Sequence, residues 1–363
     1  MSAPESRRRL PPARGLVRGP ARQRGLSIIE LMVGIVVSML VGLAAAGSAI
    51  MFTASQRQGM GAGGSGLGAA SAMSALKNDI ALAGLGFFGD SSYLCDQLAM
   101  SLNAAVLSDG APFVPVRITA GAADDSIDIV YGERVESGAN VLLDAASDGT
   151  SARVMSLLPV TAGQAVLLAP ATAGGTCLVR SITAVTASTV DDPQILDFDG
   201  AGKYNQAAFS VAPAFAERDR ITLLGEVNWN RYRRDGNTLV MDRPLDGSTV
   251  VIARNVIGLR AQYGISAAAA GSTTLELWQP ATGAFANLTG ATLPRVRAVR
   301  LGLVTRSPQR EKPDANGNCE ASLAKPQLFG AVVEPDVADW QCYRYRVSTV
   351  VVPLRNLVLG LRS

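Results

Sequence analysis

An uncharged apolar stretch near the N-terminus constrains the fold of this chain more than any other feature. No Asp, Glu, Lys or Arg occurs in residues 31–56, and about 20 apolar helical residues are enough to cross the hydrocarbon core of a bilayer. Residues 1–25 hold seven arginines and one acid, Glu5, and such a basic flank stays on the cytoplasmic side. The sequence therefore predicts one membrane-spanning helix and an exported C-terminal body.

The distribution of charge supports the same division. The formal net charge of the 363 residues is +3, and removing residues 1–25 changes it to −3. The basic character thus lies at the N-terminus, and the body has no composition typical of nucleic-acid binding. Charged residues make up 17% of the chain, too many for a polytopic membrane protein and enough for an exported domain with a sizeable core.

Glu30 separates three interpretations of the apolar segment. A signal peptide is one, since Ala44-Ala45-Ala46 offers small residues for cleavage and Arg7-Arg8-Arg9 suggests a twin-arginine signal. A plain membrane anchor is the second, but neither gains from a carboxylate that costs about 2.5–3.5 kcal/mol near the bilayer centre and less near its edge. The third is a filament subunit, in which cleavage before Leu26 creates an ammonium that pairs with Glu30 of a neighbour. We favour this third interpretation.

Gly25, Leu26 and Glu30 carry a resemblance to type IV prepilins, whose leader ends in Gly and whose mature chain has Glu at its fifth position. The resemblance implies that a prepilin peptidase cleaves between Gly25 and Leu26 and methylates the new amine of Leu26. Leu26 departs from the usual phenylalanine, and the leader is long for the group. The fold implied is α+β and pilin-like: a long hydrophobic helix followed by a mainly antiparallel β-sheet body.

The helix itself raises two questions. Gly34, Gly42 and Gly47 would let neighbouring helices approach closely, although glycine is common in membrane spans anyway. Six glycines lie within residues 59–68, and each costs about 1 kcal/mol in a helix relative to alanine. We therefore predict a frayed or extended hinge at 59–68, between a membrane helix at 26–58 and a body at 69–363. A continuous helix is the alternative.

The body begins with a helical pattern and continues with strands. Met73, Leu76, Ile80 and Ala83 form an apolar stripe in residues 69–85, with residues 77–79 off the stripe and glycines ending the helix. Short alternating or apolar runs then predict strands at 113–119, 126–132, 164–169, 176–186, 220–233, 238–243, 249–255, 256–264, 295–306 and 343–354. Asp235-Gly236-Asn237 reads as a hairpin turn, and residues 307–339 as a loop.

Four cysteines lie beyond the apolar segment, where an exported protein forms disulfides. Three connectivities are open. We take Cys319–Cys342 as one candidate pair, because it would close the loop at 307–339, and Cys95–Cys177 as the other.

Several stretches of the body resemble the PilW family of minor pilins. They are residues 76–84, 126–132, 255–264, 296–307 and 343–356, the last with its Arg-rich start and Leu-Arg-Asn end. The resemblance implies a minor subunit that primes pilus assembly with other minor pilins, the major pilin and inner-membrane assembly proteins, and supports motility, adhesion and DNA uptake. It would start as a single-pass inner-membrane protein with a periplasmic body, then join the filament at the cell surface. Two alternatives remain. One is a J-type pseudopilin of type II secretion, although such proteins are usually shorter, and the other is a tip adhesin on a pilin anchor.

Nothing in the sequence indicates catalysis or a cofactor. The chain has no histidine, so triads that use a histidine base are ruled out. The segment 314–320 alternates oxygen ligands as a calcium loop does, but its glycine is misplaced and the distal glutamate is missing; 197–200 is weaker. We interpret both as polar turns. Trp278 and Trp340 are candidates for a binding surface, though we expect core packing for both.

Overall fold

The computed structural model describes residues 28–87, 95–133, 141–171, 175–200, 202–205, 208–211, 213–267 and 274–359, with the backbone alone for 47–67. Gly25 and Leu26 lie outside these ranges. Contacts divide the chain into two units, Met1–Arg57 and Gln58–Ser363, which are described separately.

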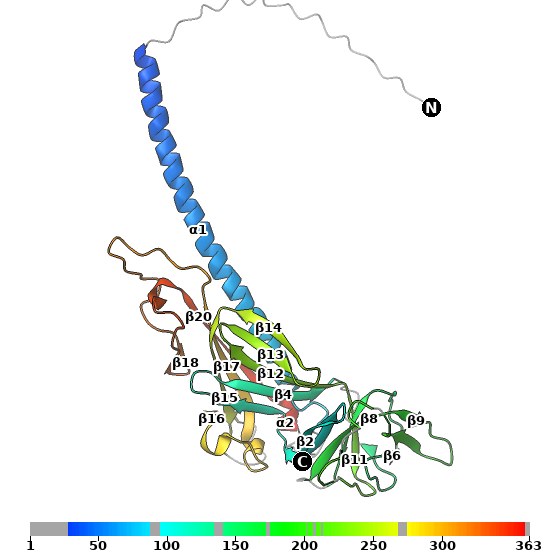
Figure 1. The fold of residues 1–363 in the computed structure, drawn as a ribbon. Coiled ribbons are helices and arrows are strands. Elements are labelled where there is room, and N and C mark those ends of the chain that lie inside the picture. The colour runs from blue at the N-terminus through cyan, green and yellow to red at the C-terminus, as the bar shows by residue number, and fades with distance from the viewer. Residues whose placement is uncertain are drawn as a thin grey trace, which may run out of the picture. The chain divides into compact units, whose positions relative to one another are not determined.

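The first helix, α1, runs without a break from Ile28 to Leu82 (Figure 1). The backbone is helical throughout 59–68, so the predicted frayed or extended segment is wrong as a conformation. A long helix has already overcome its costly nucleation, and no proline removes a hydrogen bond, so each glycine only weakens it. Whether 59–68 separates two functional parts stays a prediction.

The C-terminal part of α1 carries the predicted stripe. Leu76 and Ile80 are completely buried and Met73 and Ala83 nearly so. The helix then ends in a turn in which Gly84 and Gly86 have φ angles of +78° and +80°, a conformation that favours glycine. The stripe and its end are therefore confirmed.

Two antiparallel sheets pack around this stripe. The first has the strand order β14 (Ser248–Arg254), β13 (Thr238–Arg243), β12 (Val227–Asp235), β4 (Ser126–Gly132) and β3 (Val116–Thr119). The second has the order β16 (Leu277–Pro280), β15 (Val256–Ile265), β17 (Val296–Arg306) and β20 (Tyr345–Pro353). Both lie beside the lower part of α1 (Figure 1), and side chains of helix and sheets form one core.

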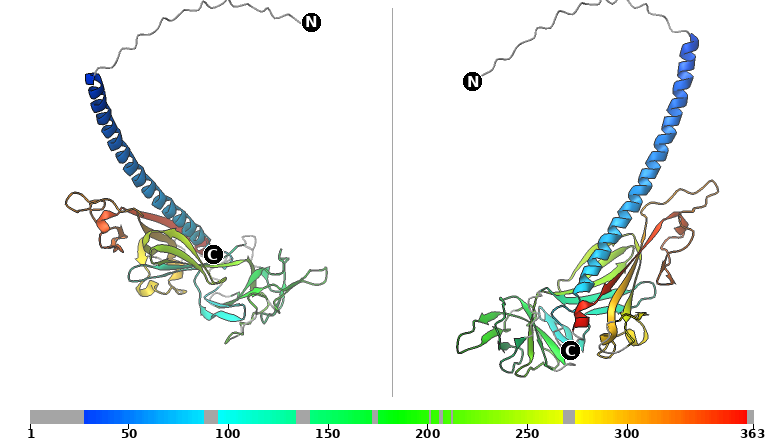
Figure 2. Two further views of the ribbon diagram at one scale, coloured as in Figure 1. Left: turned by 45° about the horizontal axis from the view of Figure 1, so that its top comes forward. Right: turned by 180° about the vertical axis from the view of Figure 1, so that it is seen from behind.

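A further lobe, residues 95–112 and 141–225, has strands of its own, which gather together in Figure 2. Its larger sheet has the order β2 (Ala105–Pro112), β1 (Gln97–Leu102), β8 (Thr176–Ser181), β7 (Ala165–Ala169), β11 (Arg220–Gly225) and β5 (Val141–Leu142). A smaller sheet has β6 (Ser151–Val154), β10 (Gln194–Asp197) and β9 (Ala184–Thr186). Cys95 and Cys177 form a disulfide beside the β1–β8 pair, the one parallel pairing among the described strands.

The segment between β17 and β20 folds back over the outer face of its sheet. It contains the Cys319–Cys342 disulfide and the two-residue strands β18 (Gln327–Leu328) and β19 (Ala331–Val332). Gly302 on β17 makes room for it, because an added Cβ would lie 2.5 Å from Leu328 Cδ2. The Arg300 guanidinium lies between the Phe329 and Trp278 rings, 4.3 and 4.8 Å from their centroids. Both disulfides therefore join the cysteines expected from the sequence.

The strand predictions are confirmed wherever the apolar pattern is regular. The bounds of β4 and β13 are those predicted, and Gly236-Asn237 forms the turn between β12 and β13. The stretch 220–233 is two strands, β11 and β12, and 176–186 is also two, β8 and β9. Eight strands were not predicted: β1, β2, β5, β6, β10, β16, and β18 and β19 within the predicted loop at 307–339. The described residues of the body form five sheets.

A tight turn between β3 and β4 joins the two main sheets. Asp124 Oδ1 accepts the Leu259 N–H at 2.9 Å, and the Asp125 N–H donates to the Leu259 carbonyl at 2.9 Å. The Arg260 guanidinium pairs with Asp125 at 2.9 Å. The turn closes only because residue 121 is glycine: a Cβ there would overlap the Asp124 carbonyl oxygen.

We expect Gly121→Ala to lower the free energy of unfolding by about 1–3 kcal/mol, because the overlap pushes the turn away from β15. Urea unfolding of the purified full chain in detergent, followed by tryptophan fluorescence, measures this. Gly68→Ala is the matched control, since its added Cβ meets nothing within 4 Å and alanine favours the helix by about 1 kcal/mol. Equal stability of the two variants would contradict the role of the turn.

Candidate functional site

The exposed N-terminal part of α1 is the first candidate surface. Residues Ile28–Ala46 have a mean hydropathy of 2.4, and every one of them is exposed. Large apolar side chains such as Ile28 and Leu31 keep 80% and 55% of their surface accessible. By length and composition this segment is able to cross a membrane.

Glu30 is the one charged residue of this segment and lies in the first described turn of the helix. The interpretation from the sequence, in which the ammonium of a neighbouring subunit neutralises Glu30, stays a prediction. No described residue forms an ion pair with it. Gly25 and Leu26, the predicted cleavage and methylation residues, lie outside the described part of the chain, so their roles remain predictions.

The second candidate site holds the helix to the body, and its centre is Asp79. The Tyr232 hydroxyl and the Asn230 side-chain amide donate to Asp79 Oδ2, each at 2.7 Å, and the Tyr131 hydroxyl donates to Oδ1 at 3.0 Å. Tyr131 belongs to β4, and Asn230 and Tyr232 to the adjacent β12. One carboxylate thus fixes the helix against two neighbouring strands.

Burial governs the ionisation of this cluster. Desolvation, and then the nearby Asp79 carboxylate, raise the pKa of the Tyr232 hydroxyl far above its usual value of 10.0. The same two causes raise the pKa of Tyr131. Both phenols therefore stay protonated at any physiological pH and keep donating to Asp79. The arrangement is one of anchorage, because a tyrosine base would need a lowered pKa.

The sequence prediction placed Asp79 off the apolar stripe, and this is the main functional position that it missed. Asp79 follows Leu76 by three residues and precedes Ile80, so it lies beside the stripe and reaches the sheet. The available signal was a tyrosine on each of two predicted strands, 126–132 and 220–233, because a buried hydroxyl needs a partner.

Both calcium-like segments form turns held by hydrogen bonds to their own backbone, and their interpretation as polar turns without calcium stays a prediction. Asp314 Oδ1 accepts the backbone N–H groups of Asn316 and Asn318 at 2.9 and 2.7 Å. In the second segment, the Thr183 hydroxyl donates to the Asp197 carbonyl and to Asp199 Oδ1. Within the described residues, no three His, Cys, Asp or Glu side chains gather as metal ligands.

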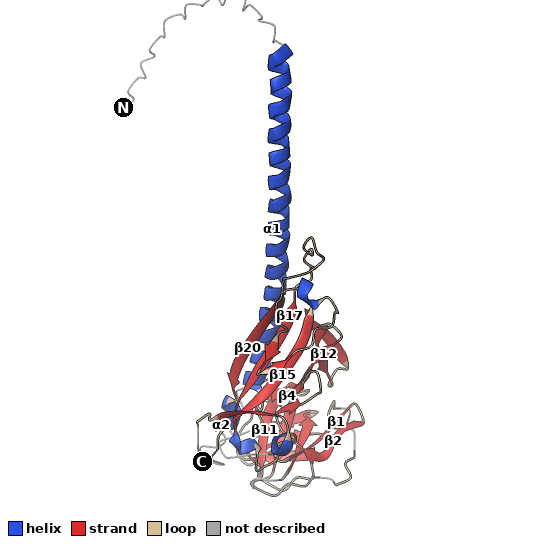
Figure 3. Cartoon of the chain, turned by 90° about the vertical axis from the view of Figure 1, so that its left-hand side faces the viewer, coloured by secondary structure: helices blue, strands red, loops and turns tan. Residues whose placement is uncertain are grey.

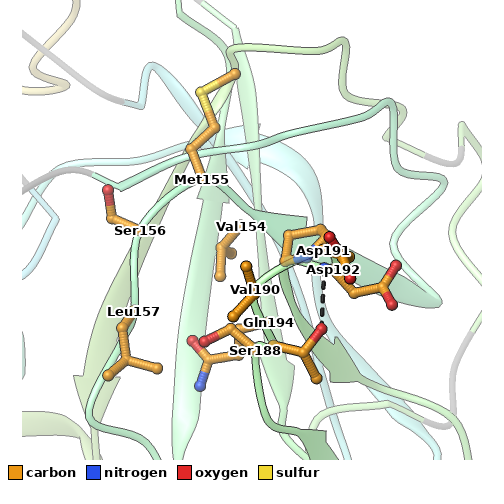
Figure 4. A pocket seen from close by; sticks show the side chains of 11 residues that line it. Val154, Met155, Ser156, Leu157, Ser188, Val190, Asp191, Asp192 and Gln194 are labelled. Carbon is orange, nitrogen blue, oxygen red and sulfur yellow. Dashed lines mark hydrogen bonds between the residues drawn. The ribbon is translucent and has the colours of Figure 1, made fainter.

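Two tryptophans and two hollows are the remaining candidate features of the body. Trp278 and Trp340 are half-buried, so the expectation of full core burial was wrong. A hollow of about 330 Å³ in the lobe is lined by Met155, Leu157 and Val190 with Asp191 beside them (Figure 4). A second, of about 240 Å³, lies between β15 and the β18–β19 turn. Neither holds a set of groups arranged for catalysis.

Two parts of the chain match models of known protein families. A model described as type IV pilus-assembly protein W matches residues 233–356, and a model of the prokaryotic N-terminal methylation motif matches residues 20–46. The two matches support a type IV pilin-like protein of the PilW type. The first match runs from within β12 through β20, and the lobe at 95–112 and 141–225 lies outside it.

A solved type IV-like pilin from Thermus thermophilus is also similar, at 10% sequence identity and a TM-score of 0.34, over 80% of this chain and 95% of that one. This likeness is loose, and the assignment rests on the two sequence matches. No curated protein matches the chain.

For the anchor at Asp79, we expect Asp79→Ala to lower the free energy of unfolding by about 2–4 kcal/mol, since it leaves two buried hydroxyls unpaired. Asp79→Asn should cost less, because an amide oxygen still accepts. Thermal and urea unfolding of the purified chain test this, with the exposed neighbours Lys77→Ala and Asn78→Ala as controls. If Asp79→Ala unfolds like the two controls, the carboxylate is not an anchor.

Proposed function

We propose that this PilW-type protein is a minor subunit of a type IV pilus: it primes assembly together with other minor pilins and remains in the filament. The observation that carries the proposal is Glu30, the single charge of the exposed apolar segment Ile28–Ala46, which lies within the matched prepilin methylation motif at 20–46. In the membrane the body lies on the periplasmic side, opposite the basic leader. In the filament it reaches the cell surface, where it supports motility, adhesion or DNA uptake.

The charge of Glu30 gives assembly a driving force and a register. Cleavage after Gly25 by the prepilin peptidase leaves an ammonium on Leu26, which the same enzyme methylates and which remains cationic. A lone carboxylate in hydrocarbon is costly, whereas a carboxylate paired with the ammonium of a neighbour is tolerated. Only one axial offset between two helices brings the groups together, so pairing selects that offset. The proposed role is structural, and it requires no catalytic side chain after processing.

Processing is tested at the junction itself. We expect Gly25→Leu to abolish cleavage, because a bulky side chain replaces the glycine that the peptidase requires, so the chain should keep its leader on a denaturing gel. Leu26→Phe is the matched control and should be processed normally. N-terminal sequencing of the mature chain should begin at residue 26. A mature start elsewhere, or normal processing of Gly25→Leu, would contradict the assignment.

Assembly is tested at Glu30. We expect Glu30→Ala to be cleaved normally but recruited poorly into sheared pili, since the ammonium of its neighbour loses its partner. Ser38→Ala, at an exposed residue of the same helix that donates only to the Ile35 carbonyl, is the control. Immunoblots of sheared pili and of membranes give the two readouts. Equal recruitment of both variants would exclude the charge pairing.

A further inference from the structure

One edge of β20 is open: it pairs with no described strand. β20 is the outermost strand of its sheet and pairs only with β17 (Figure 3). All nine of its residues pair in unbroken register, from Tyr345 opposite Arg306 to Pro353 opposite Ala298. Every other described edge strand either has four residues or fewer, or carries a register shift. Bulges and short lengths are the usual protection of a sheet edge, and β20 has neither.

The register shows which backbone groups point away from β17. The Leu354 N–H donates to the Arg297 carbonyl, and the Ser307 N–H donates to the Arg344 carbonyl, so the even-numbered residues exchange hydrogen bonds with β17. In an antiparallel pair the alternate residues direct their N–H and C=O groups to the other side. These are Tyr345, Val347, Thr349 and Val351. No described residue forms a hydrogen bond with these outward groups.

The same residues present an exposed row of side chains. Val347 and Val351 keep 44% and 51% of their surface accessible, and Thr349 between them is exposed. The alternate residues Val350 and Val352 pack toward the core of helix and sheets. β20 thus offers an extended partner both backbone hydrogen bonds and a row of β-branched contacts, which is how a strand adds to an existing sheet.

Charge indicates what kind of strand fits. Arg346 is exposed and forms no ion pair within the described chain, whereas its neighbour Arg344 pairs with Glu311. β20 itself contains no acid, so two copies joined through β20 would leave both Arg346 side chains unpaired. A different chain that brings a carboxylate to that end satisfies the charge.

We propose that β20 is an assembly edge that accepts a β-strand of another pilin-like subunit, with small or β-branched residues opposite Val347 and Val351 and an acid near Arg346. This inference rests on the proposed function, which holds such subunits in one membrane by their N-terminal helices and so raises their effective concentration. The strand joins the two bodies through one continuous sheet, in addition to contacts between their helices.

Proline substitution tests the backbone hydrogen bonds directly. Val347→Pro removes an outward N–H and leaves the hydrogen bonds to β17 intact, as proline does on an edge strand. The variant should melt near the wild-type temperature. Its affinity for the partner subunit should fall roughly fivefold, because one hydrogen bond is lost. Val347→Thr keeps the N–H and is the matched control. Wild-type association of Val347→Pro would overturn the proposal.

Cross-linking identifies the partner. All four native cysteines are in disulfides, so Val351→Cys in the full chain supplies a single thiol for a thiol-attached photo-cross-linker in pilus-assembling cells. The control is Val251→Cys on the edge strand β14, where the exposed fraction of 48% is similar. We expect a several-fold excess of one adduct at position 351, with peptides from a second chain that carries a prepilin motif, and a roughly fivefold smaller yield of that adduct in the Val347→Pro background.

The outcomes separate this inference from the proposed function. Three results would overturn the assembly edge. They are an adduct with a second copy of this chain, an adduct with a protein that is not pilin-like, and an adduct yield no higher than that of Val251→Cys. If the chain is nevertheless processed at Gly25 and present in sheared pili, the proposed function stands without it. If the chain is never processed or recruited, the proposed function fails on its own readouts, whatever β20 binds.

Discussion

The rest of the structure depends on the packing of one helical stripe against two sheets at once. Leu76 and Ile80 lie in the same core as Tyr232 of one sheet and Leu301 of the other. The stripe supplies the apolar surface that the inner faces of both sheets need, and Asp79 beside it adds three hydrogen bonds. A single helix therefore completes the body at residues 69–83 and leaves 28–46 bare, so the fold of the body and its exposed anchor are features of one continuous element.

Much of this arrangement could be predicted from local patterns, because periodicity is a local property. Alternation placed β4 and β13, and a three- and four-residue spacing placed the stripe. Two predictions failed because their outcome depends on distant residues. The glycines at 59–68 remain helical because flanking turns carry the helix through them, whatever their own propensity. Asp79 is held by hydroxyls 52 and 153 residues away in the chain, a distance over which no spacing rule applies.

The lobe at 95–112 and 141–225 was the hardest part to predict, for physical reasons that its strands show. β2 contains Ser108, Asp109 and Gly110, and two register shifts interrupt its pairing with β1, so no alternation survives along it. β1 also pairs in parallel with β8, a partner distant in sequence, and the disulfide between Cys95 and Cys177 lies there. The cysteine content predicted a disulfide. The sheet that this disulfide joins, however, is formed by contacts between residues distant in sequence. The lobe also lies outside the matched PilW region, so the body is larger than the family match alone implies.

The period of two that made β20 easy to predict also explains how its open edge can be selective. The residues whose side chains lie on the exposed face of the sheet also direct their N–H groups away from β17. A partner strand therefore contacts both the backbone and the side chains of the same residues. Pro353 ends the row, because it has no N–H, and Tyr345 at the other end packs partly against the segment that folds over the sheet. A slip of one residue would turn the partner's apolar side chains to the wrong face, so only steps of two are compatible. The exposed charge of Arg346 then distinguishes among those steps, which is how an edge that would otherwise invite unspecific pairing comes to favour one register.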